Sequence, residues 1–399
     1  MEKPAIEGGI PVRNRSDYLV FGQPEIKEDE INEVIDTLRS KWIGTGPKVI
    51  KFENMFKEYI GSKYAIAVNS CTAGLHLSML VSGIKQGDEV ITTPLTFAST
   101  ANSIVHLGAK PVFVDVNMET MNIDTSLIEK AITPKTKAIL PVHLAGRPCE
   151  MDQIMKIAKQ YNLFVIEDAA HAIESKYKGM KIGNIADFAS FSFYVTKNVI
   201  TGEGGMITTN DKEKAELIKK YALHGLSNDA WKRYSDEGYK HYSVVVPGYK
   251  YNMTDMQASL GIHQLKRVEE NLKRREEIWN IYDESFQDLS FKLPKRPEAG
   301  TRHARHLYTL LLDLNKMKIN RDQFMEALHY ENIGTGVHFI SLHLHPYYKE
   351  TYSYKEEDFL NAAFISNRIF SIPLSPKLTD KDVSDVIKAV KKIFYYYKK

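Results

Sequence analysis

Short apolar runs alternate with helix-like segments between about residues 65 and 210. Most of these runs are apolar at successive positions, as in parallel strands that are buried on both faces. Predicted strands cover residues 65–69, 89–92, 111–116, 138–143, 163–167, 188–193 and 205–209. Predicted helices between them cover residues 73–81, 98–107, 126–132 and 151–161. This alternation predicts an α/β domain with a mostly parallel central sheet.

The pattern changes after residue 255. Residues 256–286 predict one long helix, rich in Lys, Arg and Glu, that bridges two domains. Beyond it, strands are predicted at 307–312 and 336–340, and helices at 321–330, 361–368 and 381–394. We therefore predict a large domain over residues 1–260 and a smaller α+β domain over residues 261–399.

Composition excludes several classes of function. The chain of 399 residues has 53 basic and 50 acidic residues, a net charge of +3, which does not indicate a nucleic-acid partner. No apolar run is long enough to cross a membrane, so we expect no stable membrane insertion. The two cysteines, Cys71 and Cys149, form no disulfide framework, which fits a reducing cytoplasm. The histidines show no metal-ligand spacing, so no metal is expected.

A first candidate motif is Ser-Cys-Thr-Ala-Gly at residues 70–74, between a predicted strand and a predicted helix. Free backbone N–H groups and the dipole at a helix start favour an anion such as a phosphate. Ser70 and Thr72 can add hydroxyl donors. The alternative is a small-residue N-cap that binds no ligand.

A second motif is Glu-Asp-Ala-Ala-His at residues 167–171, where Asp168 follows a buried apolar strand. Ligands of open α/β sheets bind at the carboxyl ends of strands. A carboxylate there can keep a ring nitrogen protonated, which is what makes pyridoxal phosphate an electron sink. The alternatives are a loop acid that caps the next turn for Asp168, and a satisfied polar neighbour for His171.

A third motif places Lys197 after the apolar run 191–195 and before the glycine-rich turn 202–205. Partial desolvation and a nearby cation would both lower the pKa of this lysine and favour the free amine that a Schiff base requires. The alternative is a surface lysine in a loop. A fourth motif, residues 248–255, offers Lys250 and Asn252 to a phosphate, or only an N-cap at Thr254 or Asp255.

Together these motifs resemble the sugar-aminotransferase family often called DegT/DnrJ/EryC1/StrS, within the aspartate-aminotransferase-like fold. The resemblance covers nearly the whole chain, from residues 21–24 and 42–47 to residues 371–374, and is most specific over 191–205. It implies a three-layer α/β/α large domain, pyridoxal 5′-phosphate as cofactor, and a homodimer with shared active sites.

The resemblance also implies roles for individual residues. Lys197 matches the Schiff-base lysine, and Asp168 matches the partner of the pyridine nitrogen. Phe97 matches the aromatic residue that stacks on the ring, and His171 lies at the position near the ring hydroxyl. The implied phosphate site is made by Thr72, Ala73 and Ser192, with Lys250 and Asn252 from the neighbouring subunit, and Cys71 is included among the cofactor-binding positions. Cys71 stands where Gly or Ala is usual.

The substrate is indicated by a departure from the family pattern. Many members have Gly-Tyr-Asn-Tyr-Arg where this chain has Gly-Tyr-Lys-Tyr-Asn at residues 248–252. That form, and the run 338–344, are similar to enzymes that make UDP-4-amino-4-deoxy-arabinose and related amino sugars. The departure leaves open whether residue 250 or residue 252 meets the phosphate.

The resemblance therefore implies an aminotransferase that moves an amino group from L-glutamate, released as 2-oxoglutarate, to a nucleotide-linked keto-sugar, with a UDP-4-keto-sugar favoured. The expected product serves surface polysaccharide or amino-sugar biosynthesis. Dehydratases of the family carry histidine in place of the lysine, so Lys197 argues against that activity. A cysteine desulfurase needs a cysteine in a mobile loop, which neither Cys71 nor Cys149 provides. A member that binds the cofactor but acts as a regulator stays open as the alternative.

Overall fold

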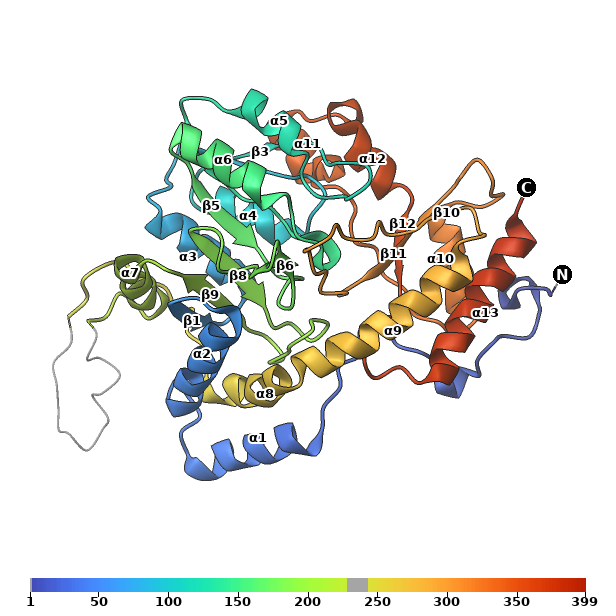
Figure 1. The fold of residues 1–399 in the computed structure, drawn as a ribbon, viewed down its shortest axis with the longest axis horizontal. Coiled ribbons are helices and arrows are strands. Elements are labelled where there is room, and N and C mark those ends of the chain that lie inside the picture. The colour runs from blue at the N-terminus through green and yellow to red at the C-terminus, as the bar shows by residue number, and fades with distance from the viewer. Residues whose placement is uncertain (1, 228–242) are drawn as a thin grey trace.

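The computed structural model describes residues 2–227 and 243–399. Its centre is a seven-stranded sheet in the order β1-β9-β8-β5-β4-β2-β3 (Figure 1). The strands are β1 (Tyr64–Val68), β2 (Glu89–Thr92), β3 (Lys110–Phe113), β4 (Thr136–Ile139), β5 (Phe164–Asp168), β8 (Phe188–Ser192) and β9 (Gly205–Thr209). Only β9 runs antiparallel to its neighbours within this sheet. The predicted mostly parallel sheet is confirmed.

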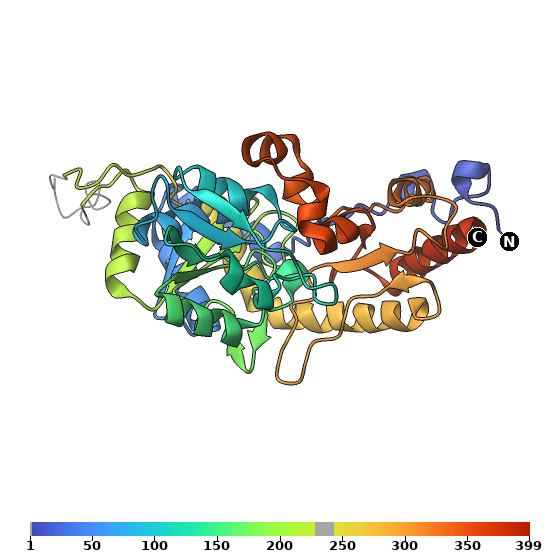
Figure 2. The same cartoon turned by 90° about the horizontal axis from the view of Figure 1, so that it is seen from above.

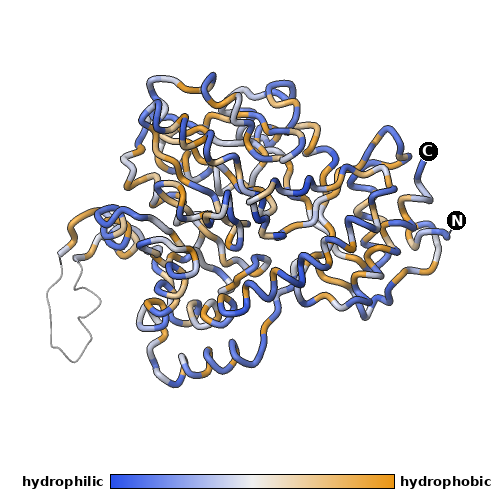
Figure 3. The backbone as a smooth tube through the Cα atoms, viewed as in Figure 1, coloured by the Kyte–Doolittle hydropathy of each residue, from blue (hydrophilic) through white to orange (hydrophobic). Residues whose placement is uncertain are grey.

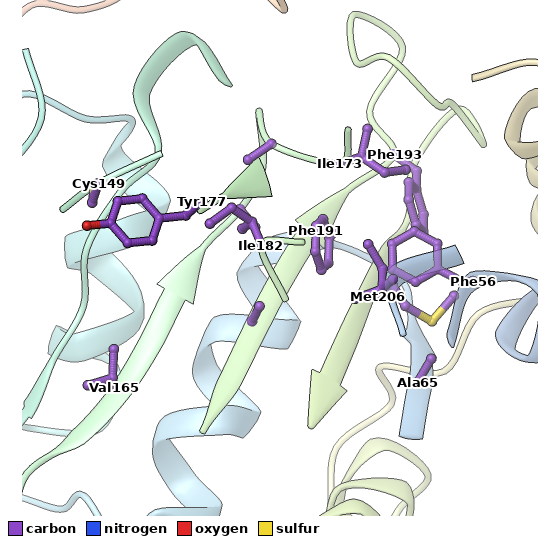
Figure 4. Packing of buried hydrophobic residues seen from close by; sticks show 14 of the residues in the cluster. Phe56, Ala65, Cys149, Val165, Ile173, Tyr177, Ile182, Phe191, Phe193 and Met206 are labelled. Carbon is purple, nitrogen blue, oxygen red and sulfur yellow. The ribbon is translucent and has the colours of Figure 1, made fainter. Parts of the chain in front are cut away.

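Helices cover both faces of this sheet, because successive strand residues point to opposite sides and both sides are apolar. One face packs against α2 (Pro47–Ile60), α5 (Thr125–Ile128), α6 (Met151–Tyr161) and α8 (Asp255–Lys266). The other packs against α3 (Cys71–Val81), α4 (Ala98–Val105) and α7 (Lys212–Ala222). Figure 4 shows the first face, where Phe56 meets the rings of Phe191 and Phe193. The three-layer prediction is confirmed.

A second body, with its own core, lies at the far end of α9 (Val268–Phe286) (Figure 2). It contains a three-stranded sheet of β10 (Phe291–Lys292), β11 (Tyr308–Leu312) and β12 (Ile369–Ile372), whose pairs are antiparallel. Helices α10 (Arg321–Tyr330) and α13 (Asp380–Tyr397) pack on it. Hydrophilic and hydrophobic residues alternate in colour along α9 and α13 in Figure 3, as expected for helices with one buried face.

The remaining elements lie between and around these bodies. They are α1 (Glu28–Ser40), the short hairpin β6 (Lys176–Tyr177) and β7 (Met180–Lys181), α11 (Pro346–Tyr352) and α12 (Leu360–Ser366). Sequence periodicity did not single out α1 or α2. Among the described residues, no helix is both long and apolar enough to cross a bilayer.

Two predicted elements are wrong in detail. The predicted helix over 256–286 is two helices, because Arg267 leaves helical geometry at φ −105° and ψ 9° between α8 and α9. The guanidinium of Arg267 pairs there with the buried Glu30 of α1. The predicted strand over 336–340 is a loop with a single bridge, from Gly336 to Ser371 of β12. Its side chains face a cavity instead of a second strand.

Contacts cross the predicted division at residue 261, which stays a prediction. The N-terminal segment packs on the second body, where Arg13 pairs with Asp382 and Asp385 of α13. Conversely, α11 and α12 share a hydrophobic cluster with β3 and α4 of the large body. Both chain ends therefore lie side by side at the same end of the molecule (Figures 1 and 2).

A buried ion pair ties α9 to the large body. The guanidinium of Arg275 donates to the carboxylate of Glu174, and both side chains are almost completely buried. The amide Nδ2 of Asn198 donates to the other oxygen of Glu174 at 2.8 Å. A buried carboxylate needs such partners, because burial disfavours its charge.

We predict that Arg275→Met lowers the free energy of unfolding by about 3–5 kcal/mol, because it leaves the charge of Glu174 buried without its cation. Arg274→Met is the matched control. Arg274 pairs with the exposed Asp380, and such a pair contributes about 1 kcal/mol or less. Urea unfolding of both variants measures the difference, and equal losses would show that the buried pair has no special weight.

Candidate active site

A cavity of about 570 Å³ lies at the carboxyl ends of β5 and β8, where the large body meets the loop around residues 336–339. Most of the residues predicted for the cofactor site line it. They are Cys71, Thr72, Phe97, Asp168, His171, Ser192 and Lys197. Parallel strands bring their carboxyl ends to one edge of a sheet, which is why motifs far apart in the sequence meet here.

The N-terminus of α3 forms one wall. Ser70 is the N-cap, and its Oγ accepts a hydrogen bond from the N–H of Ala73 at 3.1 Å. Cys71 and Thr72 begin the helix at the cavity, whereas Ala73 is buried behind them and does not line it. Hydroxyl and backbone donors at this helix start, with the helix dipole, make an anion site.

Gly205 allows this helix start to approach the sheet closely. A Cβ at Gly205 would lie 2.6 Å from the carbonyl carbon of Ser70 and 2.7 Å from the backbone nitrogen of Cys71. Gly205 opens β9, which pairs with both β1 and β8. The last position of the Gly-Glu-Gly-Gly turn therefore requires glycine, because any side chain there would collide with the start of α3.

Asp168 ends β5 and is buried, with a residual exposure of 4%. Thr100 Oγ1 donates to its Oδ2 at 2.7 Å, and the N–H of Ala170 donates to its Oδ1 at 3.2 Å. Burial raises the pKa of Asp168, while these two donors and the nearby Lys197 act to lower it. The carboxylate thus keeps hydrogen-bond capacity for a further donor in the cavity.

Lys197 lies in the turn after β8, where its N–H donates to the carbonyl of Tyr194 at 2.8 Å. Burial lowers the pKa of its amine to about 8, against the opposing effects of Cys71 and Asp168. Among the described residues, Nζ has no hydrogen-bond partner within the chain. A partly desolvated amine of this kind carries a larger free-base fraction near neutral pH than an exposed lysine does.

His171 is held in one tautomer. Its Nδ1 accepts a hydrogen bond from the N–H of Ala145 at 3.2 Å. Burial, and then the charges of Lys197 and His306, lower the pKa of His171 well below its ordinary value, so the ring is neutral. The remaining proton therefore resides on Nε2, and His171 is a hydrogen-bond donor beside the cavity.

Aromatic rings form the opposite wall. The ring of Phe97 is 61% exposed, and its centroid lies 5.9 Å from that of Phe339. Phe339 in turn stacks on His171 at 6.1 Å. An exposed phenyl face over the cavity suits a flat ring as a ligand.

The residues predicted for a phosphate divide into two groups. Ser192 ends β8 and lines the cavity together with Thr72. Lys250 and Asn252 do not line this cavity within the chain. Asn252 instead donates its Nδ2 to Thr45 Oγ1 at 2.6 Å, whereas the Lys250 side chain is exposed.

Several cavity residues were not singled out from the sequence. Phe21 comes from the N-terminal segment, and His338 and Phe339 come from the loop that was predicted to be a strand. The Nδ1 of His338 lies 2.9 Å from Ser371 Oγ, and burial lowers the pKa of this ring to about 4. The run 338–344 had drawn notice only through the family resemblance, because isolated histidines in a loop carry no periodic signal.

Comparisons with known proteins agree with this geometry. The family model of the DegT/DnrJ/EryC1/StrS aminotransferase family matches residues 24–391, and the chain belongs to this family. Over 379 residues it is 59% identical to the uncharacterised protein MJ1066 of Methanocaldococcus jannaschii, covering 95% of this chain and 98% of that one. It is 51% identical to the spore coat polysaccharide biosynthesis protein SpsC of Bacillus subtilis, covering 96% and 98%.

Solved structures give the same result. Spr1654 of Streptococcus pneumoniae in its PMP form matches with a TM-score of 0.89 and 35% identity, over 95% of this chain and 99% of that one. Its PLP form matches with a TM-score of 0.88. PseC of Helicobacter pylori, an aminotransferase involved in the biosynthesis of pseudoaminic acid, matches with a TM-score of 0.88 and 28% identity, over 96% and 100%.

The cofactor of this protein is therefore pyridoxal phosphate, and the cavity fits it chemically. The cavity offers an amine for the aldehyde, a buried carboxylate for the ring nitrogen, an exposed phenyl face and a helix start for the phosphate. The residues present thus supply a partner for each polar part of the cofactor.

We predict that Gly205→Ala weakens pyridoxal phosphate binding by about tenfold or more, because overpacking against the first turn of α3 costs about 1–3 kcal/mol. Gly44→Ala is the control, since a Cβ there meets nothing within 4 Å. Titration of each apoprotein with the cofactor, followed by visible absorbance, measures the dissociation constants. Native affinity in Gly205→Ala would show that the helix start can shift without loss.

Proposed function

We propose that this aminotransferase moves an amino group from L-glutamate to a nucleotide-linked keto-sugar, with a UDP-4-keto-sugar as the acceptor. The observation that supports it most directly is that Lys197 and Asp168 line the same cavity. One supplies an amine with a lowered pKa, and the other supplies a buried carboxylate. A buried acid and a buried base in one cleft are the combination that acid–base catalysis requires.

Lys197 has two roles in this proposal. Its Nζ would hold the cofactor covalently when pyridoxal phosphate is bound, and would be a free amine once an amino donor has taken its place. The free amine would move the proton from the α-carbon of the donor to the cofactor, and in the second half-reaction from the cofactor to the sugar carbon that receives the nitrogen. Bound pyridoxal phosphate supplies the electron sink that makes both proton transfers accessible.

Other residues would hold and orient the cofactor. Asp168 keeps the ring nitrogen protonated, and the Nε2–H of His171 donates to the oxygen on the ring. Phe97 stacks on the ring face. Thr72 and Ser192 bind the phosphate at the start of α3. These assignments rest on the family resemblance and are supported by the presence of all five side chains in the cavity lining.

The acceptor is inferred from three observations. The chain is 51% identical to SpsC, a spore coat polysaccharide biosynthesis protein. Residues 248–252 and 338–344 resemble the corresponding segments of enzymes that make 4-amino sugars of UDP. His338 and Phe339, from the second segment, line the cavity, where the ring of Phe339 lies beside that of Phe97. A cytoplasmic nucleotide-sugar pathway that feeds a surface polysaccharide fits this acceptor.

A homodimer with shared sites is part of the proposal. Lys250 is exposed and lies outside the cavity of its own chain. The amide Nδ2 of Asn252 donates to Thr45 Oγ1. The main chain of residues 250–252 is fastened beside the end of β1, where the carbonyl of Lys250 accepts from Asn69 Nδ2 at 3.3 Å. We therefore assign Lys250, in preference to Asn252, to the phosphate of the neighbouring subunit.

We predict that Lys197→Ala abolishes amino transfer, lowering kcat by more than about a thousandfold, because one side chain provides both the covalent and the proton-transfer chemistry. The native protein with pyridoxal phosphate shows a visible band that L-glutamate removes and a keto-sugar nucleotide restores. The variant shows no lysine-dependent band. A native protein whose band responds to no amino donor would favour the regulator alternative.

Subunit complementation tests the shared site. Lys197→Ala and Lys250→Ala are each expected to be nearly inactive as homodimers. Mixed dimers of the two contain one site that carries both lesions and one that carries neither, so about a quarter of native activity returns after mixing. The control mixes Lys197→Ala with Asp168→Asn, which damage the site of their own chain and restore nothing. Failure of the first mixture to recover activity would place Lys250 in its own chain's site.

A further inference from the structure

Two threonine hydroxyls form a chain that ends on Asp168. Thr96 Oγ1 lies 2.8 Å from Thr100 Oγ1, and Thr100 Oγ1 donates to Asp168 Oδ2 at 2.7 Å. Both threonines are buried, with exposures of 1% and 0%. Thr96 lines the cavity just before Phe97, and Thr100 lies in the first turn of α4.

With Asp168 ionised, the direction of both hydrogen bonds follows. A hydroxyl has one proton, and an ionised carboxylate can only accept. The proton of Thr100 therefore points to Asp168, and the proton of Thr96 points to the oxygen of Thr100. A hydroxyl that accepts one hydrogen bond becomes a better donor in the next one.

The hydrogen bond from Thr100 opposes the effect of burial on the pKa of Asp168. Desolvation by itself favours the neutral form of Asp168. The titratable groups that face the carboxyl are Lys197 in the turn after β8, His143 after β4 and the neutral thiol of Cys71 at the start of α3. The support from Lys197 is variable, because burial lowers the pKa of its amine to about 8. Thr100 and Ala170 donate to the carboxyl as neutral groups, whatever the charge of Lys197.

We propose that Thr100, with Thr96 behind it, is a positioning residue of the amino-transfer reaction. Its hydroxyl keeps Asp168 ionised and directed at the ring nitrogen of pyridoxal phosphate, so that the shared proton stays on the nitrogen. The inference rests on the proposed function of Asp168. It assigns to the Thr-Phe-Ala-Ser-Thr segment, residues 96–100, an electronic role in addition to the ring contact of Phe97.

A nearby threonine provides the matched control. Thr92 is equally buried, and its Oγ1 donates to the carbonyl of Leu140 at 2.8 Å. Thr92→Val removes a hydroxyl of the same size and burial from the same part of the fold, but one that serves only the backbone. A structural role common to buried threonines would therefore affect both variants alike.

The experiment uses the holoenzyme reconstituted with pyridoxal phosphate labelled with nitrogen-15 in the ring. The nitrogen chemical shift reports whether the ring is protonated. In Thr100→Val we expect the shift to move toward the unprotonated position, by roughly ten- to a hundredfold in the protonation equilibrium, because a hydrogen bond to a charged group has that weight. Thr100→Ser retains the native shift, and Thr96→Val moves it in the same direction by less.

Two further measurements separate the possible failures. The melting temperatures of the apoproteins compare Thr100→Val with Thr92→Val, and similar losses are expected. If Asp168→Asn moves the nitrogen signal while Thr100→Val and Thr96→Val leave it at the native position, the proposed role of the two threonine hydroxyls, the relay, is overturned. The role of Asp168 then stands. If Asp168→Asn also leaves the signal unchanged, the assignment of Asp168 under the proposed function fails. Should Thr100→Val not fold, Thr96→Val alone decides the relay.

Discussion

A carboxylate buried at the end of a central strand is the constraint that the rest of this active site meets. Asp168 is 4% exposed, and burial disfavours its charge, so the groups that donate to it stabilise the charged form. The last residue of β5 is fixed by the parallel sheet, so donors must come to it from neighbouring elements. Thr100 arrives from α4, Ala170 from the following turn and Lys197 from the turn after β8.

Burial and neighbouring charge also determine the pKa of Lys197. Burial makes the amine of Lys197 easier to deprotonate, while the anionic Asp168 in the same cavity limits that effect. The backbone beside it is tied through Asn198 to the pair of Glu174 and Arg275, and Arg275 belongs to α9. The turn that carries the reactive amine is therefore fastened to the helix that joins the two bodies, and the cavity lies where these bodies meet.

How much of this could be read from the sequence differs between the two halves of the chain. Each predicted strand between residues 65 and 209 has its counterpart in the sheet, because strands buried on both faces are uninterrupted apolar runs. The run 336–340 has similar composition and yet forms a loop, since its side chains are used by a cavity instead of a sheet. The single helix predicted over 256–286 breaks at Arg267, where a contact with Glu30 outweighs local helix propensity.

By itself the sequence determined the strands of the central sheet, the family and the chemical type of the site. Local motifs carry that information, because a lysine after an apolar strand and a small-residue helix start are short-range features. Only the tertiary structure decided which groups act on one another. The hydroxyl chain from Thr96 through Thr100 to Asp168, the tautomer of His171 and the entry of His338 depend on contacts between segments far apart in the chain. Their geometry follows from how helices and loops pack at one sheet edge, which no local pattern of residues encodes.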